Sequence, residues 1–327
     1  MWKIGNVTIN SHVVLAPMAG ITNVYYREFL KKFGIGYSVT EMISARSIVN
    51  RNVKAKELLR MSKIDTPVAI QLFGDNAEVV LSAISIIEKE MNVKYDILDI
   101  NLACPVKKII RSKSGVYWMK NINDLLFFVK KIVNFSKKPV TVKIRLGFDN
   151  IINITDLAIL LEKIGVAAIA IHARTGKQLY SGEVNFKAIE SLGKKIKIPL
   201  IISGDIFSLE KAIKAMKITS ATAVMVARGG LGNPFLVTQI NEFFNKNIKL
   251  NNPTLFEQIK YCQELFDIFF KNENEKKVLF LIKRIAPHFF KNFYNAGLIR
   301  SMLTQKVETI KDFKNILNKI KRIIKND

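Results

Sequence analysis

Residues 99–108 read Asp-Ile-Asn-Leu-Ala-Cys-Pro-Val-Lys-Lys. The apolar alternation over Tyr95–Ile100 indicates a strand, and Pro105 cannot extend it because proline lacks the N–H that a strand ladder needs. We therefore expect Asn101 and Cys104 at a strand end, where an amide, a thiol and two lysines face one cleft. These groups can donate a proton, bind a polar ring and hold phosphate. The alternative is a buried structural thiol, since a free cysteine usually packs as a small apolar residue.

The composition limits the class of protein. The 327 residues are enough for one large α/β domain and a smaller appendage. Two cysteines and three histidines, without metal-binding spacing, argue against a disulfide scaffold or a metal site and favour a reducing cytoplasm. No apolar run reaches membrane length and no signal segment opens the sequence, so we expect a cytoplasmic protein that does not bind a membrane.

The chain is strongly basic, with 51 Lys and Arg against 27 Asp and Glu and a net charge of +24. This excess makes a polyanion such as a nucleic acid the natural partner. The alternative is that AT-biased coding enriched the chain in Lys, Ile and Asn without selection for a basic surface.

Eight short apolar segments are predicted as strands, and each is followed by a helix or a long crossover. They are His12–Ala16, Gly36–Thr40, Pro67–Phe73, Tyr95–Ile100, Val140–Arg145, Ala167–His172, Pro199–Ser203 and Ala223–Val226. Lys3–Asn10 is predicted as one more strand, joined to the first of these near Asn10-Ser11. Continuous Val- and Ile-rich strands indicate a parallel sheet, and eight βα units favour a TIM (β/α)8 barrel over an open sheet.

The character of the sequence changes toward the C-terminus. Lys249–Pro253 is a polar break, and only helices are predicted beyond it, over Thr254–Lys271, Glu273–Asn295 and Thr309–Lys325. We therefore predict a barrel domain over residues 1–245 and an all-helical domain over residues 246–327. The second carries 17 basic and 8 acidic residues, with phosphate-facing candidates at Arg284, His288, Lys291 and Arg300.

Polar or glycine-bearing residues lie at the ends of most predicted strands, which places them together at the C-terminal mouth of a barrel. The motifs at these positions are Ala16–Gly20 with Thr22, Gln71–Gly74, Asp99–Asn101 with Cys104–Lys108, Ser114-Gly115, Val142–Gly147, His172 with Arg174-Thr175, Gly204–Ile206, and Arg228 with Gly232–Pro234. In this order they resemble the tRNA-dihydrouridine synthase family, and within it the bacterial B-type branch.

The resemblance implies an FMN-binding TIM barrel followed by a helical tRNA-binding domain. Family members use NADPH to reduce the flavin, which then reduces a uridine of the tRNA D loop to 5,6-dihydrouridine. By position, the residues that would bind FMN are Pro17, Met18, Ala19, Gln71, Lys143, His172, Ser203, Gly204, Asp205, Ala227 and Arg228. A monomer is expected, because each enzyme binds one tRNA.

The resemblance also implies roles at the substrate. Cys104 would protonate C5 of the uracil as a thiol with an ordinary or raised pKa. The target base would leave its stack to reach the flavin. The residues that would contact the substrate are Asn101, Lys107, Lys108, Arg145 and Arg174.

The chain departs from the family pattern at a few small residues. Ala103, Ala173 and Ala227 stand where glycine is usual, and Ser203 stands where asparagine is usual. None of these changes removes a chemical group that the reaction needs.

Two other functions would share part of this pattern. A small-molecule FMN oxidoreductase, such as a dihydroorotate or dihydropyrimidine dehydrogenase, would not need the basic helical tail or Lys107 and Lys108. A tRNA-binding folding factor without turnover would not need Met18, Gln71, Lys143 and Cys104 together. The combination favours the synthase.

Overall fold

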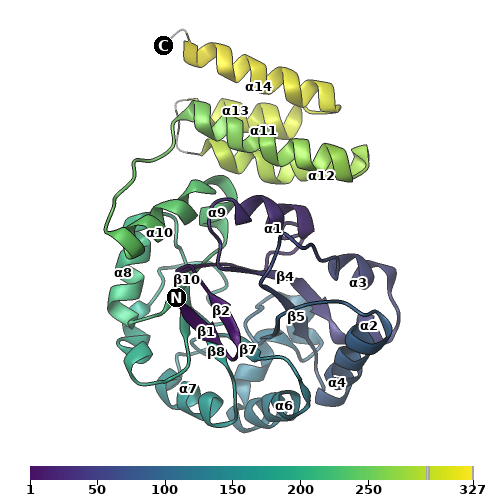
Figure 1. The fold of residues 1–327 in the computed structure, drawn as a ribbon, viewed down its shortest axis with the longest axis vertical. Coiled ribbons are helices and arrows are strands. Elements are labelled where there is room, and N and C mark those ends of the chain that lie inside the picture. Colours follow the sequence, from purple (N-terminus) through teal and green to yellow (C-terminus); the bar gives the residue numbers. More distant parts are fainter. Residues whose placement is uncertain (292, 294, 326–327) are drawn as a thin grey trace. The chain divides into compact units, whose positions relative to one another are not determined.

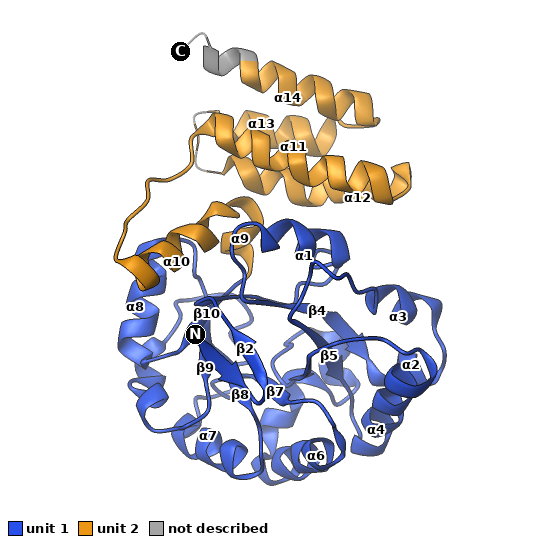
Figure 2. Cartoon of the chain, viewed as in Figure 1, with its two compact units in different colours: residues 1–226 blue, residues 227–327 orange. Residues whose placement is uncertain are grey.

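The computed structural model describes residues 1–291, 293 and 295–325, and Figures 1 and 2 show its two compact units. The first unit covers residues 1–226 and the second covers residues 227–327. The division falls earlier than the predicted boundary at residue 245. The earlier division reflects the packing of α9 (Arg228–Gly232) within the second unit. This helix lies so close to the turn that contains His288 that a Cβ added to Gly232 would be 2.0 Å from the His288 carbonyl oxygen.

The first unit is a closed eight-stranded parallel barrel with helices around it, so the predicted TIM barrel is confirmed. Its strands are β3 (Val13–Leu15), β4 (Tyr37–Ser44), β5 (Val68–Phe73), β6 (Ile97–Asn101), β7 (Val140–Arg145), β8 (Ala168–His172), β9 (Leu200–Ser203) and β10 (Ala223–Val226). The barrel closes where Val224 of β10 pairs with Val13 of β3. Nearly every strand residue is buried, as expected for a sheet covered on both faces.

The N-terminal hairpin differs from the prediction. Its strands are β1 (Trp2–Ile4) and β2 (Val7–Ile9), which pair antiparallel. Both lie inside Lys3–Asn10 and its flank, where one strand was predicted, and the turn is at Gly5-Asn6 and not near Asn10-Ser11. Gly5 has φ +57°, a conformation that glycine adopts without strain.

The connections of the barrel are mostly helical. Its α-helices are α1 (Val24–Lys31), α2 (Ala45–Val49), α3 (Val53–Leu58), α4 (Ala77–Ser85), α5 (Lys107–Arg111), α6 (Ile122–Phe135), α7 (Ile154–Lys163) and α8 (Leu209–Thr219). The shorter turns are η1 (Ile86–Glu90), which is π-helical, and the 3₁₀ turns η2 (Gly115–Lys120), η3 (Phe186–Ile189) and η4 (Leu192–Lys194). The connection after β5 is therefore α4 followed by a π turn, and the connection after β8 contains only 3₁₀ turns.

Side-chain caps explain where several of these helices begin. Asn76, Asn121 and Ser208 each precede a helix and accept a hydrogen bond from a backbone N–H of its first turn. Such caps satisfy N–H groups that have no partner within the helix. The asparagines that AT-biased coding could supply therefore serve the fold at these positions.

The second unit contains only helices among its described residues. They are α9, α10 (Phe235–Lys246), α11 (Leu255–Asn272), α12 (Glu275–Ile285), the 3₁₀ turn η5 (Ala286–Phe290), α13 (Ala296–Gln305) and α14 (Ile310–Lys325). The single helix predicted over Glu273–Asn295 is wrong, because it stops at Ile285. Pro287 lacks the N–H that an α-helix needs there, and the chain tightens into η5.

The helical unit has its own apolar core. The rings of Phe266 and Phe313 meet edge to face with centroids 4.8 Å apart, and Phe269 packs beside them. Phe289 and Phe290 of η5 are also buried. No described helix in either unit is long and apolar enough to cross a membrane. The described residues also include no cluster of three or more His, Cys, Asp or Glu side chains that could hold a metal ion.

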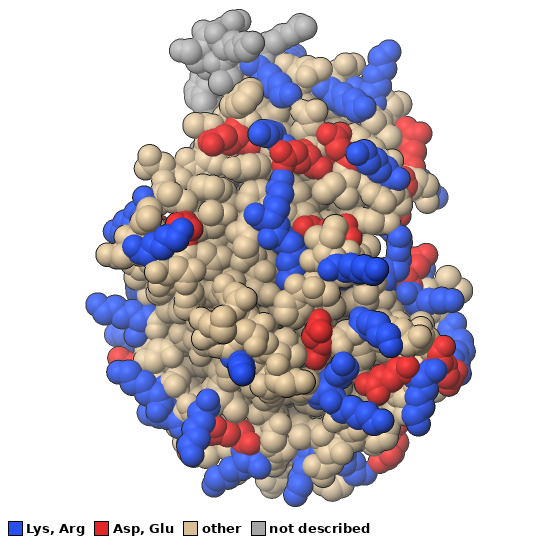
Figure 3. Space-filling model, viewed as in Figure 1, with Lys and Arg blue, Asp and Glu red and all other residues tan. Residues whose placement is uncertain are grey.

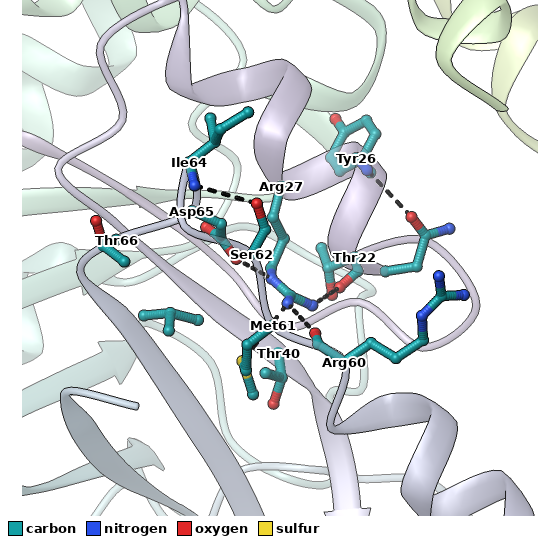
Figure 4. A network of polar contacts seen from close by, with 12 residues as sticks. Thr22, Tyr26, Arg27, Thr40, Arg60, Met61, Ser62, Ile64, Asp65 and Thr66 are labelled. Carbon is teal, nitrogen blue, oxygen red and sulfur yellow. Dashed lines mark hydrogen bonds and ion pairs between the residues drawn. The ribbon is translucent and has the colours of Figure 1, made fainter. Parts of the chain in front are cut away.

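A buried ion pair holds the connection before β5 against α1 (Figure 4). Arg27 donates from Nε to Asp65 Oδ2 at 2.5 Å, and both side chains are almost completely buried. Its other nitrogens donate to the carbonyl oxygens of Thr22 at 2.9 Å and Arg60 at 2.8 Å. Burial raises the pKa of the Asp65 carboxyl more than Arg27 lowers it, so the pair depends on the hydrogen bonds that Arg27 makes to Asp65, Thr22 and Arg60.

We predict that Asp65→Asn lowers the free energy of unfolding by about 3–5 kcal/mol, because it leaves the Arg27 charge buried without a counter-ion. Urea unfolding of the purified variant measures this change. Asp75→Asn is the matched control, since Asp75 pairs with Arg46 at 3.0 Å on the surface and should cost less than about 1 kcal/mol. Equal losses in the two variants would contradict the assignment of Arg27–Asp65 as a buried anchor.

Candidate active site

A row of polar side chains crosses the barrel interior on neighbouring strands. The register pairs Gln71 of β5 with Asp99 of β6, and Asp99 with Thr141 of β7. Gln71 Nε2 donates to Asp99 Oδ2 at 2.6 Å, and Thr141 Oγ1 donates to Asp99 Oδ1 at 2.5 Å. Burial is the main effect on Asp99 and raises the pKa of its carboxyl to about 6, while the two hydrogen bonds and Lys143 oppose the rise.

Asn101 joins this row to the loop that carries the thiol. Its Nδ2 donates to Gln71 Oε1 at 2.7 Å. Its Oδ1 accepts the backbone N–H groups of Ala103 at 3.1 Å and Cys104 at 2.9 Å. The second N–H of the Asn101 amide points to the sulfur of Met42 at 3.6 Å, which is a weak acceptor. The amide thus fixes the position of Cys104 and keeps one weakly used donor.

Lys143 lies opposite Asn101 on the neighbouring strand and is half-buried. Burial, and next the charge of Arg145, lower the pKa of its ammonium to about 8, against the opposing effects of Asp99 and Cys104. The ammonium makes no hydrogen bond or ion pair with any described side chain or backbone group. A cation held in the barrel without a direct partner favours an anionic or electron-rich ligand at this position.

The Cys104 thiol is half-buried beside these groups. Burial raises its pKa above that of a free thiol, and a hydrogen bond from the Val106 backbone and the charges of Lys143 and Arg145 oppose the rise. A thiol in this state stays protonated at neutral pH, so it can act as an acid and is a poor nucleophile. This is the pKa direction that proton donation requires.

The loop after β3 carries Pro17, Met18 and Ala19, and Ala19 is exposed. Thr22 holds this loop, because its Oγ1 accepts the Met18 N–H at 3.0 Å and donates to the Met18 carbonyl at 3.3 Å. Gly20, which follows Ala19, donates its N–H to Glu41 Oε2 at 2.5 Å. The segment is therefore held by hydrogen bonds to Thr22 and to Glu41 of β4.

Arg145 is buried and its hydrogen bonds go to the backbone of two rim loops. Nε donates to the Ala103 carbonyl at 2.9 Å, and Nη1 donates to the carbonyls of Thr175 and Leu179, both at 2.7 Å. Its guanidinium also lies over the Tyr180 ring, 5.4 Å from the centroid. This placement assigns Arg145 to holding the loops; its predicted contact with substrate stays a prediction.

Arg174 is also buried and faces Asp205. Nη2 and Nη1 donate to the two carboxylate oxygens at 2.5 and 3.2 Å, and Nη2 also donates to the Gly182 carbonyl at 2.6 Å. Asp205 follows Gly204, whose φ of +122° favours glycine, and a Cβ on Gly204 would lie 2.7 Å from the Val184 side chain. The two-point ion pair therefore fixes the turn that contains Ser203, Gly204 and Asp205.

The remaining candidates lie at strand ends or on the surface. His172 ends β8 and its ring meets the Tyr180 ring edge on, with centroids 6.2 Å apart. Lys107 and Lys108 open α5 and are exposed. Ala227 and Arg228 directly follow β10 in the chain and begin the second unit, where Arg228 is exposed.

The structure thus joins Gln71, Asn101 and Cys104 in one hydrogen-bonded chain, with Lys143 beside them. Sequence reasoning quoted Asp99 only as part of a motif and did not assign it or Thr141 a role. The signal for Asp99 was present, because a carboxylate two residues before Asn101 on a strand shares its face.

A family model described as dihydrouridine synthase (Dus) matches residues 14–325. The chain belongs to the dihydrouridine synthase family. It is 35% identical over 272 residues to a probable tRNA-dihydrouridine synthase of Rickettsia conorii, covering 82% of this chain and 80% of that protein. It is 31% identical over 306 residues to tRNA-dihydrouridine synthase B of Pasteurella multocida, covering 90% of this chain and 91% of that protein.

Solved structures support the fold of this family member. The old yellow enzyme from Trypanosoma cruzi superposes with a TM-score of 0.50 and 13% identity, covering 79% of this chain and 94% of that one. The old yellow enzyme homologue from Zymomonas mobilis gives a TM-score of 0.51 and 12% identity with the same coverage. At this identity the likeness concerns the barrel fold alone.

We predict that Gly115→Ala lowers the free energy of unfolding by about 2 kcal/mol, because Gly115 has φ +62° and the added Cβ would lie 2.7 Å from the Cys104 carbonyl oxygen. Urea unfolding measures the loss. Gly297→Ala is the control, since nothing lies within 4 Å of the added Cβ, and it should leave stability unchanged or raise it by up to about 1 kcal/mol because Gly297 lies in α13. A wild-type stability in Gly115→Ala would contradict the tight packing of the thiol loop.

Proposed function

We propose that this chain is an FMN-dependent tRNA-dihydrouridine synthase that uses NADPH to reduce the C5=C6 bond of a D-loop uridine. The observation that carries the proposal is the half-buried Lys143 ammonium, without a direct partner, beside a protonated thiol and an amide pair. Family membership and the names of the relatives support it. A small-molecule reductase or a folding factor would share the fold, and the experiment below separates the three.

The residues at the barrel mouth fit a flavin. Gln71 uses one N–H and one lone pair within the protein, so its remaining N–H and lone pair can bind the pyrimidine edge of the ring. Lys143 supplies a cation for the N1/O2 region. Pro17, Met18, Ala19 and His172 would line the ring, and Ser203–Asp205 with Ala227 and Arg228 would hold the phosphate. FMN, reduced by NADPH, would supply a hydride from N5 to C6 of the uracil.

Cys104 would supply the proton. Its raised pKa keeps the thiol protonated, and Asn101 holds the backbone N–H of Cys104 so that the thiol has a fixed position. Proton delivery to C5 by a positioned acid completes the reduction of the double bond. The weakly used N–H of Asn101 would turn to a uracil carbonyl.

The cations on the surface would bind the tRNA backbone. Figure 3 shows Lys and Arg side chains spread over the visible face, in line with the net charge of +24. Lys107 and Lys108 open the helix that follows Cys104 and would contact phosphates near the target base. Arg145 and Arg174 would contribute by holding the rim loops in place.

The experiment that tests the function is an anaerobic half-reaction. The flavin of the purified protein is reduced and mixed with unmodified tRNA, and flavin reoxidation is followed together with the dihydrouridine formed. Reoxidation matched by dihydrouridine supports the proposal. A flavin that is reduced but not reoxidised by tRNA would instead indicate a small-molecule reductase, and tRNA binding without any flavin would indicate a folding factor.

We predict that Cys104→Ala reduces the rate of dihydrouridine formation at least about a hundredfold, because general acids contribute factors of this size. Flavin binding and tRNA binding should stay close to those of the wild type. Cys262→Ala is the control, since Cys262 is the other thiol of the chain and is buried in the helical unit. Unchanged turnover in Cys104→Ala would refute the assignment of the acid.

The helical unit contains a group of cations suited to phosphate. Arg228 and Arg300 are close enough to His288 and Lys291 to lower the pKa of both, and every charged group acting on these two side chains is a cation. Burial contributes first in each case, and the pKa of His288 falls to about 4, so this histidine is neutral at pH 7. Basic side chains grouped in this way favour a polyanionic partner. This arrangement supports the assignment of residues 246–327 to tRNA binding.

We predict that Lys291→Gln weakens tRNA binding and lowers the slope of log affinity against log salt by about 1, because one phosphate contact is lost. Filter binding at several salt concentrations measures both quantities. Lys277→Gln is the control, since Lys277 pairs with Glu273 at 2.8 Å within the same unit. Equal slopes in the two variants would contradict a phosphate contact at Lys291.

A further inference from the structure

Asp99 has no part in the chemistry proposed above, yet it lies at the start of the hydrogen-bonded chain that ends at Cys104. Only 3% of its surface is exposed. It lies two residues before Asn101 on β6 and is flanked in register by Gln71 and Thr141. A buried carboxylate costs free energy unless its oxygens are hydrogen-bonded, and both oxygens of Asp99 have a donor.

The chain of hydrogen bonds has one direction, and Asp99 determines it. An ionised carboxylate only accepts, so Gln71 must turn its Nε2 toward Asp99 and its Oε1 toward Asn101. Asn101 must then turn Nδ2 toward Gln71, which leaves Oδ1 for the N–H groups of the thiol loop. Every donor in the chain points toward Asp99.

A neutral group at position 99 removes this direction. A carboxylic acid or a carboxamide can donate a hydrogen bond to Gln71. The side-chain amides of Gln71 and Asn101 can then both rotate by half a turn, which exchanges their oxygen and nitrogen atoms. Asn101 would then present Nδ2 to the N–H groups of Ala103 and Cys104, and two donors cannot bond to each other. The loop would lose the acceptor that holds Cys104.

We propose that ionised Asp99 is a positioning residue, which orients the amides of Gln71 and Asn101 and thereby holds the Cys104 loop for proton delivery. This inference rests on the proposed function for its meaning, but the hydrogen-bonded chain exists without flavin or tRNA. It can therefore be tested on the protein alone.

The charged and titratable groups around Asp99 set the pH at which this control is lost. Lys143 on β7 favours the ionised form of Asp99. On β4, burial raises the pKa of the Tyr37 phenol, and the charge of Asp99 adds to this rise. With the Asp99 pKa raised to about 6, mainly by burial, the carboxylate takes up a proton as the pH falls below about 6. The row of hydrogen bonds from Asp99 to Cys104 should then lose its single direction, and the Cys104 loop should be released.

The test follows the rate at which Cys104 reacts with methyl methanethiosulfonate between about pH 5 and 8, a window that spans the Asp99 pKa. Mass spectrometry after digestion separates Cys104 from Cys262, which is completely buried and serves as an internal reference. If only the thiolate fraction changed, the rate would rise tenfold per pH unit throughout. We expect the wild-type rate to lie above this line below about pH 6, where the loop is released.

Two variants decide the matter. Cys104 of Asp99→Asn should react about tenfold faster than that of the wild type at pH 7, because the hydrogen bond that holds Cys104 is lost. Its rate should rise tenfold per pH unit over the whole range, without the change of slope (the break) expected for the wild type. Thr141→Val keeps the direction of the chain but removes a hydrogen bond that favours ionised Asp99. It should react like the wild type at the upper end of the range and show its break at a higher pH. Circular dichroism confirms that each variant is folded.

A wild-type break retained in Asp99→Asn, or a break that does not move in Thr141→Val, overturns the proposal. If Asp99→Asn does not fold, the shift of the break in Thr141→Val decides alone. A protein that passes this test and makes no dihydrouridine would refute the proposed function while leaving the role of Asp99 intact.

Discussion

Closure of the barrel between β10 and β3 is the constraint on which the rest of the structure depends. Val224 pairs with Val13, and with this bond row complete no strand edge remains in the barrel. All eight strands are parallel, so closure brings their C-terminal ends to one rim. Residues that are more than a hundred positions apart in the chain, such as Met18 and Lys143, then lie at that same rim without any direct bond between them.

Much of the fold followed from local pattern, and the failures have identifiable causes. The eight barrel strands were found because they are continuous apolar runs between helices. The sequence pattern does not predict the end of the helix before Pro287, because amphipathic spacing continues on both sides of it. The proline itself is the residue type that indicates this end. The predicted turn near Asn10-Ser11 is wrong, because the first hairpin turns at Gly5, which has a positive φ. The π turn at Ile86–Glu90 has no signal in the residue types.

The sequence predicts that Gln71, Asn101 and Cys104 lie close together, but it does not predict the hydrogen bonds that join them. Gln71, Asn101 and Cys104 were placed at strand ends by pattern, and strand register then makes their contact natural. The sequence predicts Arg145 and Arg174 as substrate contacts but does not predict their partners within the protein, because a long flexible side chain can reach many groups. Both are buried and donate to backbone carbonyl groups, and Asp205 pairs with Arg174 at the turn that contains Gly204.

Arg145 has a consequence for how such a chain can evolve. It ties the Cys104 loop to the segment after His172 through the carbonyls of Ala103, Thr175 and Leu179. An insertion or deletion in either loop would shift carbonyl groups that the same guanidinium must reach. The two loops should therefore vary together among related proteins, in length as well as in residue type, wherever this arginine is retained. Where it is replaced, both loops should have changed as a pair.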